Sequence, residues 1–201
     1  NGEIVASLNT QASYVREIGH NLIKNVEVEI GGQRIDKHYG EWLSIWNDLT
    51  LSKSQRTNYN KMIGNIEKLY GNSYEKPSYT LNIPLEFWFN RNPGLALPLI
   101  ALQYHEVKFN IEFDTLANLR TGTNTGTAQL TNTSIYIDYI YLDTDERRRF
   151  AQTSHEYLIE QLQFTGEESV TTGATSTSLK LNFNHPVKEL IWTVQHDAAV
   201  T

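Results

Sequence analysis

The stretch VEVEIGGQRI, residues 26–35, alternates apolar and polar side chains on either side of two adjacent glycines. Such alternation is typical of a β-strand with one buried face and one face in water. Both central positions of a two-residue hairpin turn require positive φ, which glycine adopts without steric cost. Gly31 and Gly32 are therefore predicted to form a hairpin turn between two antiparallel strands.

A two-residue turn also predicts which side chains of this hairpin face each other. It sets Glu29 opposite Arg34 on the wet face, a favourable cross-strand pair, and Val28 opposite Ile35 on the buried face. The next wet pair in this register joins two carboxylates, one of them from Asp36, which is unfavourable. Strand pairing is therefore predicted to end before Asp36.

Similar alternation recurs along the chain and predicts further strands. One of these segments, Ile135–Leu142, is apolar on both faces, which indicates a second packed layer or a subunit contact. Repeated short strands with few helices and long loops predict an all-β fold, an antiparallel β-sandwich. The segments are Tyr79–Phe89, Val107–Phe113, Ile135–Leu142, Tyr157–Phe164, Leu179–Phe183 and Leu190–Val194.

Helical spacing appears in one place. Apolar residues at steps of three and one predict a short helix from His38 to Thr50 with one buried face. The polar stretch Ser52–Asn65 is expected to form a loop or a second short helix. The residues of the predicted buried face are Tyr39, Trp42, Leu43, Trp46 and Leu49.

Composition excludes several classes of function. The formal net charge of -6 disfavours binding to nucleic acid, and the densest basic cluster, Arg147–Arg149, directly follows acidic residues. The chain has no cysteine, so it has neither a disulfide framework nor a thiolate metal site. No apolar stretch approaches the roughly 18–20 residues that a membrane-spanning helix needs.

No motif supports an enzyme, and we expect no catalytic residue, cofactor or metal ligand. His105-Glu106 and His155-Glu156 lack the second histidine of a zinc helix, and Gly31-Gly32 lacks the lysine of a phosphate loop. Trp42 and Trp46 could form a sugar-stacking platform, although tryptophans at a spacing of four on a helical face are more often packing residues. Asn132 heads the sequon Asn-Thr-Ser and is a candidate glycosylation site.

Three longer phrases carry a family resemblance. They are IGGQRIDKHYGEWL (30–43), NPGLALPLIALQYHEVKFNIEF (92–113) and DERRRFAQTSHEYLIEQLQ (145–163). With them the chain resembles the major capsid proteins of the nucleocytoplasmic large DNA viruses, which include phycodnaviruses, iridoviruses and mimivirus relatives. The resemblance extends from about Ile18 to Trp192. It implies a double jelly-roll chain with short helices in the loops.

The resemblance also implies how the chain is divided. Residues 1–144 would form the first jelly roll with N-terminal strands missing, 145–155 a linker, and 156–201 the truncated beginning of the second jelly roll. The chain starts at Asn1 and has one methionine, so we expect it to be a piece of a longer polypeptide.

By the same resemblance, the chain would form homotrimeric, pseudo-hexagonal capsomers that tile an icosahedral shell. Its partners would be itself, minor capsid proteins and penton proteins, with an inner viral membrane nearby but not spanned. It would lie in the virion after assembly in the host cytoplasm, without direct contact to nucleic acid. The candidate inter-subunit or inter-domain packing residues are Leu95, Leu97, Leu99, Ile100, Tyr136, Ile140 and Leu142.

Two alternatives remain open. Jelly rolls also occur in lectins, so a carbohydrate-binding or attachment protein on a virion surface is the second hypothesis. An enzyme of the cupin type is a more distant third, because the clustered histidine and glutamate ligands it needs are missing.

Overall fold

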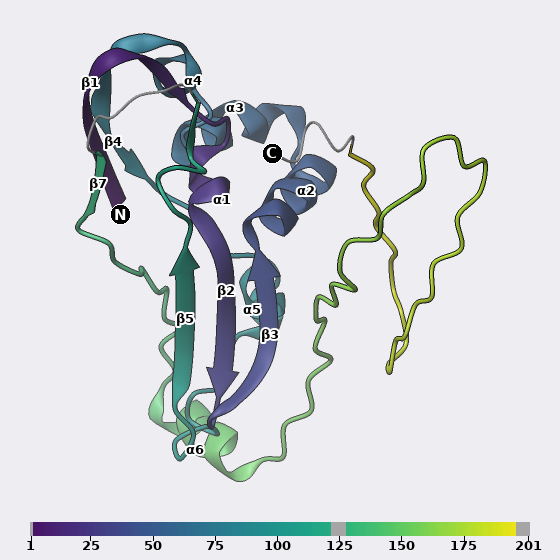
Figure 1. The fold of residues 1–201 in the computed structure, drawn as a ribbon. Helices are drawn as coiled ribbons and strands as arrows, with labels where there is room; N and C mark the ends of the chain where they lie inside the picture. The colour runs from purple at the N-terminus through teal and green to yellow at the C-terminus, as the bar shows by residue number, and fades with distance from the viewer. Residues whose placement is uncertain (1, 122–127, 196–201) are drawn as a thin grey trace. The chain divides into compact units, whose positions relative to one another are not determined.

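The computed structural model describes residues 2–121 and 128–195, which belong to two compact units, Asn1–Gln161 and Leu162–Thr201. All strand pairs among the described residues are antiparallel, and all lie in the first unit (Figure 1). One sheet has the order β4-β1-β6, with β7 also paired to β1, and a second has the order β3-β2-β5. The strands are β1 (Gly2–Tyr14), β2 (Ile23–Ile30), β3 (Gln33–Tyr39), β4 (Ser73–Leu81), β5 (Val107–Phe113), β6 (Arg120–Thr121) and β7 (Ala128–Thr131).

The helices are short, and all but α6, which follows β7, lie between strands in the described part of the chain. The connection from β3 to β4 carries three of them, α2, α3 and α4. The helices are α1 (Ile18–Leu22), α2 (Gly40–Thr50), α3 (Lys53–Met62), α4 (Glu67–Tyr70), α5 (Trp88–Arg91), the 3-10 turn η1 (Pro93–Leu95) and α6 (Thr144–Gln152).

The β2–β3 hairpin turns at Gly31 and Gly32, whose φ angles are 62° and 79°. Glu29 pairs with Arg34 as predicted, but the register beyond that pair is wrong. A bulge leaves Ile35 without a ladder partner, and Asp36 lies opposite Val28.

The bulge also explains why strand pairing does not end before Asp36. Shifting β3 by one residue places Lys37, instead of a carboxylate, opposite Glu27, and their side chains form an ion pair of 2.8 Å. The hairpin therefore continues to the pair of Asn25 with Tyr39.

The helix predicted from His38 begins at Gly40, because β3 continues through Tyr39. Leu43 is fully buried as predicted, whereas Leu49 is 60% exposed, so its placement on the buried face is wrong. The polar stretch that follows contains α3, which begins with a capping box between Ser52 and Gln55.

Several predicted strands are absent from the described structure. The strand expected at Tyr79–Phe89 ends at Leu81, and Phe87 instead precedes α5, where Asn90 accepts its backbone N–H. Pro84, which cannot donate to a ladder, lies in the intervening coil. The segments expected at 135–142, 157–164, 179–183 and 190–194 are also not strands. A strand needs a hydrogen-bonded neighbour, and none of the described residues forms a ladder with these segments.

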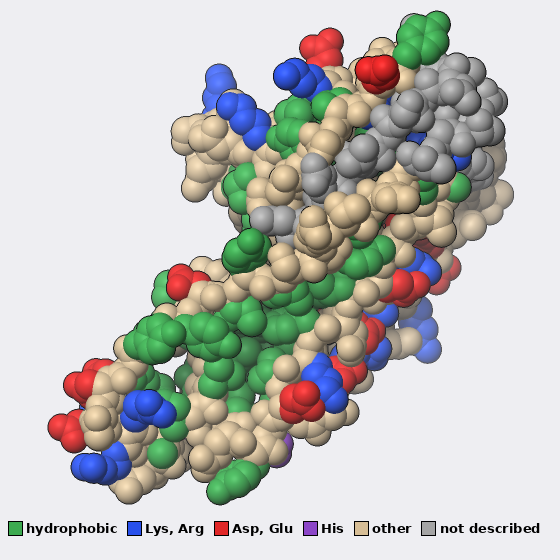
Figure 2. Space-filling model, turned by 90° about the vertical axis from the view of Figure 1, so that its left-hand side faces the viewer, with side chains coloured by type: hydrophobic (Ala, Val, Ile, Leu, Met, Phe, Trp, Pro, Cys, Tyr) green, Lys and Arg blue, Asp and Glu red, His purple; other side chains and the backbone are tan. Residues whose placement is uncertain are grey.

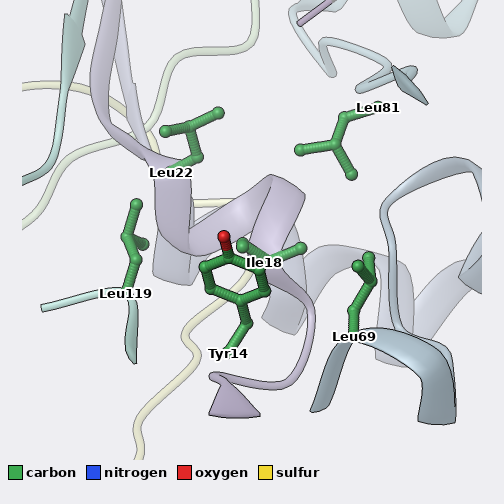
Figure 3. Close-up of a cluster of buried hydrophobic side chains, with 6 residues drawn as sticks. All are labelled: Tyr14, Ile18, Leu22, Leu69, Leu81 and Leu119. Atoms are coloured by element: carbon green, nitrogen blue, oxygen red, sulfur yellow. The ribbon is translucent and has the colours of Figure 1, made fainter. Parts of the chain in front are cut away.

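Two apolar clusters support the two sheets. The first surrounds α1, where side chains from β1, α4, β4 and the residue before β6 converge (Figure 3): Tyr14, Ile18, Leu22, Leu69, Leu81 and Leu119. The second lies against the β3-β2-β5 sheet and contains Ile23, Val26, Val28, Leu43, Phe87 and Trp88.

Candidate assembly surface

An exposed apolar segment lies between β7 and α6. Tyr136 is 79% exposed and Ile140 63% exposed, while Leu142 is partly buried. Figure 2 shows hydrophobic side chains gathered on the side where β5 and this segment lie in Figure 1, with charged side chains beside them. Large exposed apolar areas of this kind are typical of interaction sites. The exposed members of the segment are Ile135, Tyr136, Ile137, Tyr139, Ile140 and Tyr141.

The second candidate segment is divided between core and surface. Leu95 and Leu97 are partly buried and pack against the apolar cluster of the β3-β2-β5 sheet. Leu99 is 44% exposed, and Ile100 is partly buried. The structure therefore leaves Leu99 as the most available contact residue of this segment, while Leu95 and Leu97 help to hold the sheet.

An apolar groove that the sequence did not predict lies beside Leu97. Its volume is about 430 Å³, and its lining includes Ile30, Trp88, Leu97, Phe150, Tyr157 and Ile159. His155 also lines the groove, and its ring stacks on the Phe150 ring at 5.0 Å between centroids, with Nε2 2.7 Å from the Phe150 carbonyl oxygen. In the sequence, only the alternation of His155, Tyr157 and Ile159 could have indicated that these side chains share a face of such a groove.

The outer face of the β3-β2-β5 sheet is polar and paired. Lys24 lies 2.6 Å from Glu112, and the Asn110 amide donates to Glu29 at 2.8 Å. Opposite charges alternate across this face, so it offers neither a basic patch for phosphate nor an apolar contact surface. The contrast with the exposed segment 135–141 makes that segment the stronger candidate for contact with another protein.

A partly buried polar network joins the first three helices. The Glu17 carboxylate accepts from the Ser44 hydroxyl at 2.5 Å and lies 3.3 Å from His20 Nδ1. His20 Nε2 lies 2.9 Å from the Tyr59 hydroxyl, so one neutral tautomer of His20 satisfies both contacts. Glu17 has a φ of 52°, a strained backbone that this network holds in place.

The same contacts set the ionisation of Glu17. Its hydrogen bond with His20 is the main cause that lowers the pKa of Glu17, assisted by Ser44 and by the charges of His20 and Arg56, against the opposing effect of burial. A carboxylate with a lowered pKa stabilises the fold fully above its ordinary value of 4.5 and loses this contribution as the pH falls through the folded-state pKa.

We expect Glu17→Gln to lower the free energy of unfolding by about 1–3 kcal/mol near neutral pH, since the buried donors lose a charged acceptor. The difference from the parent protein should shrink as the pH falls below the ordinary pKa of 4.5, where the unfolded chain binds the proton, and should be lost as the pH falls through the lowered pKa of Glu17 in the folded protein. Urea unfolding at several pH values measures this. Glu75→Gln, at an exposed glutamate of β4, is the control and should show little change. A pH-independent effect of Glu17→Gln would contradict the assignment.

A second buried polar pair lies under the β3-β2-β5 sheet. His38 Nε2 is 3.0 Å from Asp36 Oδ2, and the His38 ring stacks on Phe87 at 4.4 Å.

Burial raises the pKa of nearby Glu86, against the effects of Arg91, His38 and His20. No group of three or more histidine, cysteine or acidic residues in the described ranges is arranged to hold a metal ion.

The other predicted positions are distributed over the surface. Asn132 is exposed, directly follows β7 and has a φ of 52°. Trp42 and Trp46 lie 5.7 Å apart, and the Arg91 guanidinium covers the Trp46 ring at 4.7 Å. The proposed sugar platform therefore has part of its stacking surface occupied. Within the described part of the chain, no helix has the length and apolar character needed to cross a bilayer.

Comparison with known proteins identifies the family. A family model described as "Major capsid protein N-terminus" matches residues 2–143, and one described as "Large eukaryotic DNA virus major capsid protein" matches residues 146–201. The major capsid protein of Pyramimonas orientalis virus is 54% identical over 203 residues, covering 96% of this chain and 49% of that protein. The chain belongs to the major capsid protein family of large eukaryotic DNA viruses.

Further comparisons support membership of this major capsid protein family. The major capsid protein of Phaeocystis pouchetii virus is 50% identical over 235 residues, covering 98% of this chain and 45% of that protein. A quasi-atomic model of the PBCV-1 virus capsid matches with a TM-score of 0.71 and 40% identity, covering 92% of this chain and 45% of that one. The expected antiparallel jelly-roll fold class is confirmed. The chain spans about half the length of the curated relatives it matches.

Proposed function

We propose that this protein is a structural component of a viral capsid and acts by self-assembly, without catalysis. Its membership of the major capsid protein family carries the proposal, and the exposed apolar segment 135–141 supplies a surface that association would bury. Stable subunit interfaces of the obligate kind bury more than about 2,000 Å² and resemble a protein core. Exposed tyrosine and isoleucine side chains suit such a contact.

The assembly we propose is a homotrimer of pseudo-hexagonal outline that tiles an icosahedral shell of the virion. Minor capsid and penton proteins are its further partners, an inner membrane lies nearby, and assembly takes place in the host cytoplasm. The chain divides into a first jelly roll at 1–144, a linker at 145–155 and the beginning of a second at 156–201. The family models, which match 2–143 and 146–201, support this division.

The experiment measures self-association by sedimentation and the symmetry of the particles by electron microscopy. Ile140→Asp should weaken association at least about tenfold, because a charge in a closed apolar interface is costly. Leu49→Asp is the matched control, since Leu49 and Ile140 are 60% and 63% exposed. If both variants assemble equally well, segment 135–141 is not part of the interface. A parent protein that stays monomeric at high concentration refutes the capsid proposal itself.

A further inference from the structure

Residues 153–161, which we call the strap, follow α6 and end at Gln161, the last residue of the first unit. The strap packs loosely. Tyr157 and Ile159 line the apolar groove without filling it, Ile159 remains 43% exposed, and Leu158 is 81% exposed. A side chain that faces a groove lacks packing partners on that side, so apolar contacts alone hold the strap weakly.

Polar contacts concentrate instead at the end of the strap. Glu160 Oε2 lies 3.4 Å from Arg91 Nη1, and the same guanidinium lies 4.7 Å from the centre of the Trp46 ring. Arg91 therefore sits between a strap carboxylate and an aromatic ring of α2. Arg91 is 22% exposed and Glu160 37% exposed, so dissolved salt can screen their attraction.

The second contact uses the β-bulge. Ile35 is the extra residue of β3, between the pairs made by Arg34 and Asp36, and it has no ladder partner. The Gln161 side-chain amide donates a hydrogen bond to the Ile35 carbonyl oxygen. The irregularity in β3 thus supplies the acceptor that holds the last residue of the strap.

From these contacts we propose that Arg91 and the Ile35 carbonyl form a salt-sensitive latch that holds the strap on the first unit. With the latch closed, the chain leaves this unit from a fixed point at Gln161. With the latch open, residues 153–161 detach while the two apolar clusters stay intact. The latch goes beyond the proposed function and does not depend on it, because its contacts lie within one chain.

Limited proteolysis with chymotrypsin tests the latch, with cleavage after Tyr157 and Leu158 resolved by mass spectrometry. A protease needs a locally detached segment, so the cleavage rate reports strap opening when closing is fast. Arg91→Ala and Glu160→Gln should each raise this rate about five- to tenfold. The double variant should not exceed the faster single one, since each single variant already breaks the Arg91–Glu160 pair. Gln161→Ala should raise the rate by a similar factor.

Glu156→Gln is the matched control, because Glu156 is an exposed glutamate of the same strap. Its rate should stay within about twofold of the parent. Raising the salt concentration from about 0.05 M to about 1 M should speed cleavage of the parent and leave Glu160→Gln unaffected. Thermal unfolding followed by circular dichroism should be the same for all variants, which separates strap opening from loss of the fold. Multiplicative effects of Arg91→Ala and Glu160→Gln, or rates equal to the parent, overturn the proposal.

Discussion

Phe87→Ala is expected to destabilise the protein by about 3–5 kcal/mol, because it removes a large side chain from a fully packed position. Phe87 has no measurable exposure. Its ring stacks on His38 at 4.4 Å and on Phe89 at 5.6 Å, and lies 6.3 Å from the ring of Phe109. The substitution would leave a cavity among aromatic rings that α5 and two strands hold in place. The surrounding side chains can therefore move little to fill this cavity.

The loss of Phe87 has a second consequence. Its ring covers one face of His38, which is paired with buried Asp36. Opening this face removes the packing that orients the imidazole toward the carboxylate. We therefore expect the effect to lie in the upper part of the range.

Urea unfolding followed by circular dichroism and tryptophan fluorescence measures the effect of Phe87→Ala. Phe113→Ala is the matched control, since Phe113 is 39% exposed on β5, and it should cost less than about 1.5 kcal/mol. Similar losses for the two variants would mean that Phe87 does not lie at the centre of the second apolar cluster.

The sequence predicts the β2–β3 hairpin and β5 well because local pattern and tertiary packing agree there. Alternation indicates which side chains share a face, and the glycine pair indicates where the chain turns. The sequence does not predict the bulge at Ile35, because an apolar residue followed by a charged one is normally expected to bury the apolar side chain and expose the charged one. In the structure Asp36 is buried, while Ile35 is partly buried and still packs against the second apolar cluster. The partner of Asp36, His38, lies two residues further along the same face of β3.

Alternation also fails where a strand lacks a neighbour. Residues 135–142 have the side-chain pattern of a strand, yet none of the described residues forms a ladder with them. Their apolar character predicts a contact surface, but it does not specify the partner. The groove beside Leu97 was missed for a related reason. The alternation of His155, Tyr157 and Ile159 shows that they share a face, and only the fold shows that this face lines one groove together with Trp88.

Leu43 and Leu49 of α2 differ in burial although they belong to the same helix. Helical spacing placed Leu43 and Leu49 on one buried face, but the structure buries Leu43 completely and leaves Leu49 60% exposed. The exposure of Leu49 has a geometric cause. Asn47, whose amide donates to the Leu43 carbonyl oxygen at 2.7 Å, occupies the next buried position of α2, so the inward face runs through residues 43 and 47. Leu49 lies two residues beyond Asn47, on another side of the helix.

We therefore expect Leu43→Ala to lower the free energy of unfolding by about 2–5 kcal/mol and Leu49→Ala by less than about 0.5 kcal/mol. The two substitutions remove the same atoms from the same helix, so helix propensity changes equally in both. Their difference measures burial alone, and urea unfolding under identical conditions determines it. Equal losses would support the face predicted from spacing and would require α2 to be rotated about its axis relative to the β3-β2-β5 sheet.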